Sequence, residues 1–168
     1  MRRAGLMAAA TAGLLMASAV GACGRPTDPL APPAIAYGED VCAECGMIVS
    51  EARFAAAIVV EAEPGVTEAR VFDDIGEMLR HQARQPGLVV RRWYVHDYVS
   101  LDWLDATTAT FVRAGGIETP MAFGVVAFRD PARARALADE AHGEVLTFDG
   151  LRTGEQSALS TVRMRPRQ

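Results

Sequence analysis

Residues 53–72 read RFAAAIVVEAEPGVTEARVF, and this stretch decides the fold. Its first half is an apolar run from Arg53 to Glu61, and its second half alternates polar and apolar residues up to Phe72. Pro64 and Gly65, between the two halves, are typical turn residues. The pattern therefore predicts two paired strands joined by a tight turn.

The elements predicted after this hairpin occur twice in the same order. A capping pattern at Asp74 and Glu77 starts a helix over about 73–85, and a strand follows over 88–98. Further on, the sequence predicts strands over 109–113 and 121–128, a helix from Asp130-Pro131, and a strand over 144–148. We expect an α+β fold of two small sequential β-β-α-β lobes, residues 39–105 and 106–150, packed together because neither buries much core alone.

The N-terminal segment is typical of a bacterial lipoprotein. Arg2 and Arg3 precede an uncharged apolar run, so residues 1–22 are predicted to be a signal peptide. The run ends in Val-Gly-Ala before Cys23, which resembles a lipobox and predicts acylation of Cys23. The alternatives are an ordinary signal peptide or a membrane-spanning anchor, although the run is short for a span of about 20 residues.

The regions flanking the predicted lobes have little core-forming character. Residues 23–38 are rich in proline and are predicted to be an extended tether. Residues 151–168 are polar and rich in arginine, and they are predicted to be a disordered tail.

Composition and charge exclude several functions. All 17 basic residues are arginine, so no lysine is available for a P-loop or a Schiff base. Without residues 1–22 the formal charge changes from −4 to −6, which argues against nucleic acid as a partner. Half of the residues are hydrophobic, which indicates a folded body rather than a disordered chain.

The chemistry is concentrated in Cys42-Ala43-Glu44-Cys45-Gly46-Met47. Two thiols and a thioether this close together place three soft ligands near one ion, and soft ligands favour Cu(I). Three alternatives stay open, namely a structural disulfide, a redox pair and a zinc site, but the first two do not use Met47. A structural zinc site needs four ligands, and the sequence has no second Cys-x-x-Cys or closely spaced histidine pair.

Met121 is a second candidate ligand because it follows Thr119-Pro120 beside a predicted turn. A lone methionine entering a strand is by default a core side chain. From the residues alone, both interpretations stay open.

Five motifs occur in the order seen in the NosL family, the copper-binding lipoproteins that accompany nitrous oxide reductase. They are Cys42-x-x-Cys45-Gly46-Met47, Phe72-Asp73-Asp74-Ile75-Gly76, Trp103-Leu104-Asp105-Ala106, Thr119-Pro120-Met121-x-x-Gly124 and His142-Gly143-x-x-Val145-Leu146-x-Phe148. The resemblance covers about residues 39–150, together with the lipobox, and implies a fold akin to that of organomercurial lyase. We do not transfer the activity of that enzyme, because a Cys-x-x-Cys near the N-terminus is not its catalytic arrangement.

The resemblance implies a ligand set for Cu(I). Cys45 and Met47 are the leading ligands, Met121 is the ligand from the second lobe, and Cys42 either binds the ion, forms a disulfide with Cys45 or supports the loop. Asp97, after the strand over 88–98, is predicted to orient the metal loop through a hydrogen bond, with a turn-forming role as the alternative.

The implied function is that of a non-enzymatic, periplasm-facing membrane lipoprotein that delivers Cu(I). Its expected partners are nitrous oxide reductase or the assembly complex that loads the copper sites of that enzyme, and membrane lipid through Cys23. The alternative is a membrane-tethered thiol-disulfide oxidoreductase or thiol-repair factor that uses Cys42 and Cys45.

Overall fold

A computed structural model describes residues 28–164, with side chains from 28 to 157. The predicted signal peptide (1–22), the predicted acylation site Cys23 and the last residues of the predicted tail (165–168) lie outside the described residues. None of the helices in the described range is both long and apolar enough to cross a bilayer.

The first lobe is built on the predicted hairpin. Strand β1 (Ala56–Glu63) pairs antiparallel with β2 (Val66–Phe72), and the chain turns at Pro64-Gly65. Helix α1 (Ile75–Arg84) follows, and then β3 (Val90–His96) pairs with the other edge of β1. A short strand that the sequence did not predict, β4 (Trp103–Asp105), extends the sheet to the order β2-β1-β3-β4.

The second lobe repeats this arrangement on a smaller scale. Strand β5 (Thr110–Arg113) lies between β6 (Val125–Phe128) and β7 (Glu144–Thr147), and α2 (Pro131–Glu140) connects the two outer strands. In both lobes the first strand is central and the other two pair antiparallel with its two edges. The predicted pair of β-β-α-β lobes is therefore confirmed.

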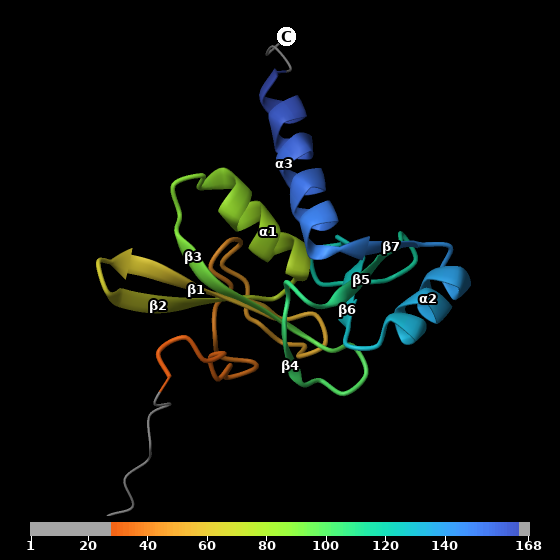
Figure 1. Cartoon of the computed structure of the whole chain (residues 1–168), viewed down its shortest axis with the longest axis horizontal. Helices are drawn as coiled ribbons and strands as arrows, with labels where there is room; N and C mark the ends of the chain where they lie inside the picture. Colours follow the sequence, from red (N-terminus) through yellow and green to blue (C-terminus); the bar gives the residue numbers. More distant parts are fainter. Residues whose placement is uncertain (1–27, 165–168) are drawn as a thin grey trace, which may run out of the picture.

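The two lobes share one hydrophobic core. Phe111, Val125 and Ala127 of the second lobe belong to the same buried cluster as residues of β1, α1 and β3. An isolated bridge connects the two sheets, between Asp97, which follows β3, and Ala127 in β6. Figure 1 shows the two sheets side by side, with α1 and α3 adjacent to each other on one side of them.

The predicted disordered tail is wrong for residues 151–164. Helix α3 (Phe148–Met164) begins directly after β7, and Leu151 in its first turn is 1 % exposed within the shared core. Phe148 and Leu151 are buried in the core, whereas the other described residues of α3 are mostly polar. The second lobe therefore extends past residue 150, and the polar composition of the tail concealed its packed start.

The described part of the predicted tether is irregular and lies against the first lobe. The Tyr94 hydroxyl donates to the Leu30 carbonyl at 2.6 Å, and the Thr67 hydroxyl donates to the Pro29 carbonyl at 3.2 Å. Ile35 packs on the core. From residue 29 onward this segment is therefore held by the folded body.

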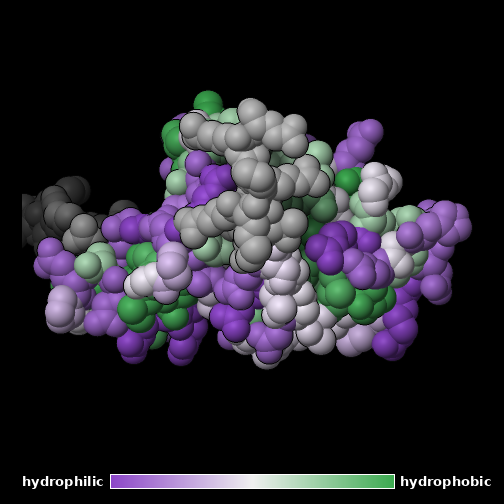
Figure 2. Space-filling view, turned by 90° about the horizontal axis from the view of Figure 1, so that it is seen from above, coloured by the Kyte–Doolittle hydropathy of each residue, from purple (hydrophilic) through white to green (hydrophobic). Residues whose placement is uncertain are grey.

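The surface on the side toward which α3 extends is mainly hydrophilic. Figure 2 shows this face with small, separate apolar areas among polar side chains. The exposed apolar residues nearest the sulfur motif are Val41, Met47 and Ile48, each about half exposed.

Candidate metal centre

The sulfur motif lies in a tight hairpin loop between Val41 and Ile48, which pair as an isolated antiparallel bridge. Within the loop, the Cys42 amide donates to the Met47 carbonyl at 2.7 Å, and the Gly46 amide donates to the Cys42 carbonyl at 3.0 Å. Gly46 has a φ of 77°, a left-handed conformation that favours glycine. The glycine therefore lets the loop reverse between Cys45 and Met47.

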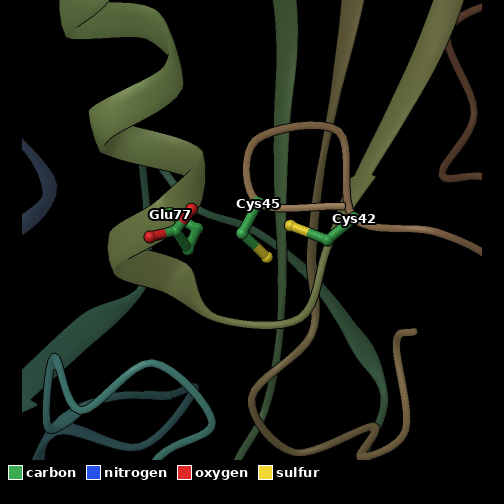
Figure 3. A group of neighbouring side chains, drawn as sticks. All are labelled: Cys42, Cys45 and Glu77. Atoms are coloured by element: carbon green, nitrogen blue, oxygen red, sulfur yellow. The ribbon is translucent and has the colours of Figure 1, made fainter. Parts of the chain in front are cut away.

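The two cysteines lie beside the first turn of α1, where Figure 3 shows Glu77 next to Cys45. The sulfur atoms of Cys42 and Cys45 and a carboxylate oxygen of Glu77 all lie within 4.8 Å of one another. Both cysteines are free thiols. Cys42 is 2 % exposed and belongs to the core, whereas Cys45 is partly exposed. The cluster therefore has a buried side at Cys42 and an accessible side at Cys45.

Burial controls the protonation of this cluster. It raises the pKa of the Cys42 thiol to about 12, although neighbouring amides favour the thiolate. Burial also raises the pKa of Glu77, where Arg80 opposes the shift and Glu44 and Asp73 add to it. The Cys42 thiol is therefore protonated at neutral pH, and a metal that binds it must displace a proton.

These surroundings do not suit Cys42 as an attacking thiol. Thiol exchange needs a thiolate, and reactive cysteines have a lowered pKa and an accessible sulfur. Cys42 has the opposite properties, so the geometry disfavours the redox alternative for this residue.

The start of α1 connects this cluster to the second lobe. The Cys45 sulfur lies 3.7 Å from an oxygen of Asp73, the residue before the N-cap Asp74. Asp74 accepts from the Gly76 amide through one oxygen, at 2.8 Å, and through the other it accepts from the Thr119 hydroxyl at 2.6 Å and the Met121 amide at 3.1 Å. Burial raises the pKa of Asp74 despite these donors.

This arrangement places both thiols and the Met121 backbone at the start of α1. Met47 is 51 % exposed, so its side chain is not part of the core. Met121 is partly buried, and its backbone amide donates to Asp74. Asp74 directly follows Asp73, whose carboxylate lies beside the Cys45 sulfur. The structure thus brings Cys42 and Cys45 together and fixes the Met121 backbone at the same helix end. Their role as ligands stays a prediction.

Comparison with known proteins identifies the family. The NosL family model matches residues 33–155, which is well over half of the chain. The chain belongs to the NosL family.

A solved structure agrees with this assignment at the level of the fold. The copper chaperone NosL from Shewanella denitrificans is similar to this chain with a TM-score of 0.63 and 20 % sequence identity. The similarity covers 73 % of this chain and 96 % of that one. Among functionally curated proteins, none gives a significant match.

Sequence reasoning missed the acidic residues around the thiols of this NosL chain. Glu77 was recognised only as part of a capping pattern, and Asp73 only as part of a motif. Glu44, between the two cysteines, accepts from the His81 ring at 2.9 Å and pairs with Arg84, which fastens the loop to α1. The available signal was the group of three carboxylates, Asp73, Asp74 and Glu77, within five residues at the start of the helix.

Asp97 is hydrogen-bonded to the chain around Ser100 and Arg129 and not to the loop over 42–47, within the described residues. Its carboxylate accepts from the Ser100 amide at 2.9 Å and the Arg129 amide at 2.8 Å, and none of its hydrogen bonds within residues 28–157 reaches the loop over 42–47. Burial opposes ionisation of Asp97, but these backbone donors prevail and lower its pKa. The turn-forming alternative therefore describes Asp97, which also joins the two lobes of the NosL fold.

Proposed function

We propose that this chain is a Cu(I)-binding metallochaperone whose ion is held by Cys45, Met47 and Met121, with Cys42 behind them. The observation that supports this proposal most directly is that Met47 is half exposed, in the loop that also presents the partly exposed Cys45. A methionine at this position contributes little to the core, whereas a thioether beside a thiolate suits a soft monovalent ion. The name of the Shewanella denitrificans structure supports the same role.

Transfer by ligand exchange suits the accessibility of these side chains. Met47 and Cys45 lie toward solvent, so a thiolate or thioether of a partner can approach the ion before the first ligands leave. Cys42 is enclosed in the core and is the least accessible of the proposed ligands to a partner. We infer that Cys45 and Met47 release the ion first.

The proposed destination is the set of copper sites of nitrous oxide reductase, reached directly or through an assembly complex. The five ordered motifs support this destination, because they resemble a family that accompanies that enzyme. The lipobox at Cys23 supports delivery from a membrane-anchored position facing the periplasm. The proposed role is that of a carrier and not of an enzyme.

The ligand set is tested by anaerobic Cu(I) titration of residues 24–168 against a competing chelator. We expect Cys45→Ala to abolish tight binding and Met47→Ala and Met121→Ala to weaken it, since each removes a soft ligand. Cu(I) should also raise the melting temperature of the wild type by mass action. Melting of the metal-free variants separates ligand loss from a core cavity, which costs about 2–5 kcal/mol.

Unchanged Cu(I) affinity in both methionine variants would exclude the proposed site. If Cys42→Ala and Cys45→Ala lowered the Cu(I) affinity equally and neither methionine variant changed it, the thiol-disulfide oxidoreductase would be favoured instead. Delivery is measured on the same proteins, as the copper content of nitrous oxide reductase in cells that produce each variant. A fully loaded reductase in cells with Cys45→Ala would contradict delivery.

A further inference from the structure

Glu44, which lies between Cys42 and Cys45 in the sequence, connects the sulfur loop to the last turn of α1. Its side chain is only 9 % exposed. Its carboxylate accepts from Nδ1 of His81 at 2.9 Å and also pairs with Arg84, and both partners belong to that last turn. A buried carboxylate is costly unless it is paired, so these contacts favour a loop that stays against the helix.

Further contacts fix the His81 ring itself. Its Nε2 lies 3.1 Å from a guanidinium nitrogen of Arg70 in β2 and 2.9 Å from the side-chain nitrogen of Gln85. A guanidinium has only donors, so Nε2 accepts and Nδ1 carries the proton that is donated to Glu44. The ring also packs on Phe72, with the two ring centres 5.2 Å apart. The imidazole is therefore held in the tautomer and the orientation that the carboxylate needs.

The loop backbone is held at the neighbouring residue as well. The Ala43 amide donates to the carbonyl of Val71 in β2 at 2.9 Å. The middle of the loop is therefore tied to β2 through Ala43 and to α1 through Glu44, with one cysteine on each side of this double attachment. Neither attachment uses a sulfur atom, so both thiols stay available to an ion.

We propose that Glu44, His81 and Arg70 form a clamp that fixes the sulfur loop and slows the release of the bound ion. Only the effect on release rests on the proposed function, because the effect on the loop needs no metal. Removing hydrogen bonds that orient metal ligands typically lowers metal affinity by about 10–100-fold. A loop that is already ordered loses less conformational freedom when it binds an ion, so the ion leaves more slowly. His81 is a positioning residue that acts through Glu44.

Burial ranks the two partners of Glu44. The side chain of His81 is 7 % exposed, whereas that of Arg84 is 55 % exposed. An exposed ion pair contributes little because water and salt screen it. A buried carboxylate that loses a hydrogen-bond donor, in contrast, keeps the cost of its desolvation. We therefore expect the loss of His81 to loosen the loop more than the loss of Arg84.

The clamp is tested first without metal, on reduced residues 24–168, by amide hydrogen exchange and by alkylation of Cys42. The amides of Cys42 and Gly46 form the hydrogen bonds that close the loop, so their exchange reports its opening. We expect His81→Leu to accelerate both measurements by roughly tenfold or more, and Arg84→Gln by less than about threefold. The amides of β1 are the internal reference, because global unfolding would accelerate them too.

A rescue variant and a double variant separate positioning from a general loss of stability. The side-chain nitrogen of asparagine is bonded to Cγ, as Nδ1 is in histidine, so His81→Asn keeps a donor for Glu44. It should stay within about threefold of the wild type. In a Glu44→Ala background, His81→Leu should add less than about twofold, because the group it acts through is already absent. Arg91→Gln removes an exposed ion pair with Glu61 and is the matched control that should change neither measurement.

Transfer of Cu(I) from each loaded protein to an excess of a chromophoric chelator, followed by stopped-flow absorption, measures release. We expect His81→Leu and Glu44→Ala to release the ion about tenfold faster than the wild type, and His81→Asn at close to the wild-type rate. An unchanged release rate in the first two variants would overturn the control of release and leave the copper site standing.

The clamp itself is overturned if loop exchange and Cys42 alkylation are unchanged in His81→Leu and Glu44→Ala, or if His81→Asn is as impaired as His81→Leu. If His81→Leu does not fold, Glu44→Ala decides alone, because it removes the loop's side of the same contact. A wild type that does not bind Cu(I) contradicts the proposed function and with it the control of release, whereas the exchange rates still decide the clamp.

Discussion

Cys42 and Cys45 have the same side chain but different surroundings. Cys42 packs among apolar residues of the shared core, and Cys45 lies at the edge of the loop near Asp73. Burial raises the pKa of Cys42 to about 12. The pair is therefore asymmetric, with a buried protonated thiol on one side and an accessible thiol on the other.

Alkylation of residues 24–168 measures this asymmetry. The thiolate is the reacting form, so we expect Cys42 to be alkylated at pH 8 at least about tenfold more slowly than Cys45. Because the pKa of Cys42 is raised, its reaction should continue to accelerate with pH well above pH 9, as long as the fold persists. Mass spectrometry of peptides after timed quenching gives both rates.

Denaturant provides the control for this measurement. In the unfolded chain the two thiols have similar surroundings, so their rates should converge. Equal alkylation rates in the folded protein would show that Cys42 is not buried and that the pKa of its thiol is not raised.

At the scale of elements, the first turn of α1 joins the two lobes. A Cβ atom added at Gly76 would lie 2.0 Å from Cγ of Phe123, in the loop that also carries Met121. Arg80, one turn further along, stacks on the Phe123 ring with its guanidinium 4.3 Å from the ring centre. The absence of a side chain at Gly76 therefore allows the second-lobe loop to lie directly on the helix.

Gly76→Ala tests this contact, and two effects oppose each other. Alanine is intrinsically more favourable than glycine in a helix by about 1 kcal/mol. The added Cβ would, however, collide with Cβ and Cγ of Phe123, and rotation of the ring does not move these two atoms away. We expect the collision to prevail and the free energy of unfolding to fall by about 1–3 kcal/mol. Urea denaturation gives this value directly.

Gly115→Ala is the matched control, because a Cβ atom there meets open space and the backbone has no positive φ. It should change the free energy of unfolding by less than about 0.5 kcal/mol. A Gly76→Ala protein as stable as the wild type would mean that the loop over 119–124 does not pack closely on α1.

At the scale of the whole molecule, the shared core makes the two lobes one body. The segment before the body is tied down at Pro29 and Leu30, so only residues 24–28 separate Cys23 from the first anchored residue. Six residue steps reach at most about 20 Å. If Cys23 is acylated, the body is therefore held close to the bilayer surface.

Replacing Cys23 with serine in the full-length chain tests the anchor. We expect wild-type protein in the membrane fraction, because two or three acyl chains attach a protein firmly to a bilayer. Cys23→Ser lacks the thiol that is predicted to be acylated, so we expect it in the soluble fraction. Cys42→Ser is the control and should stay with the membrane. Retention of Cys23→Ser on membranes after a salt wash would contradict acylation at this residue.

The sequence by itself determined the features that depend on neighbours in the chain. The β1-β2 hairpin follows from alternation and a Pro-Gly turn, and the start of α1 follows from the Asp74 cap. The repeated order of elements was readable because each lobe has its own turns and caps. The sulfur loop was found for the same reason, since Cys42, Cys45 and Met47 lie within six residues.

Only the tertiary structure decided which distant residues meet. Cys45 and Asp73 are 28 positions apart, and Asp74 and Met121 are 47 apart, so no local pattern encodes either contact. Glu77 served a helix-capping pattern equally well whether or not it faced two thiols, and Leu151 carried too little apolar sequence around it to reveal a packed helix. Periodicity and turn chemistry specify an element, whereas the neighbours of a buried side chain depend on how the elements pack.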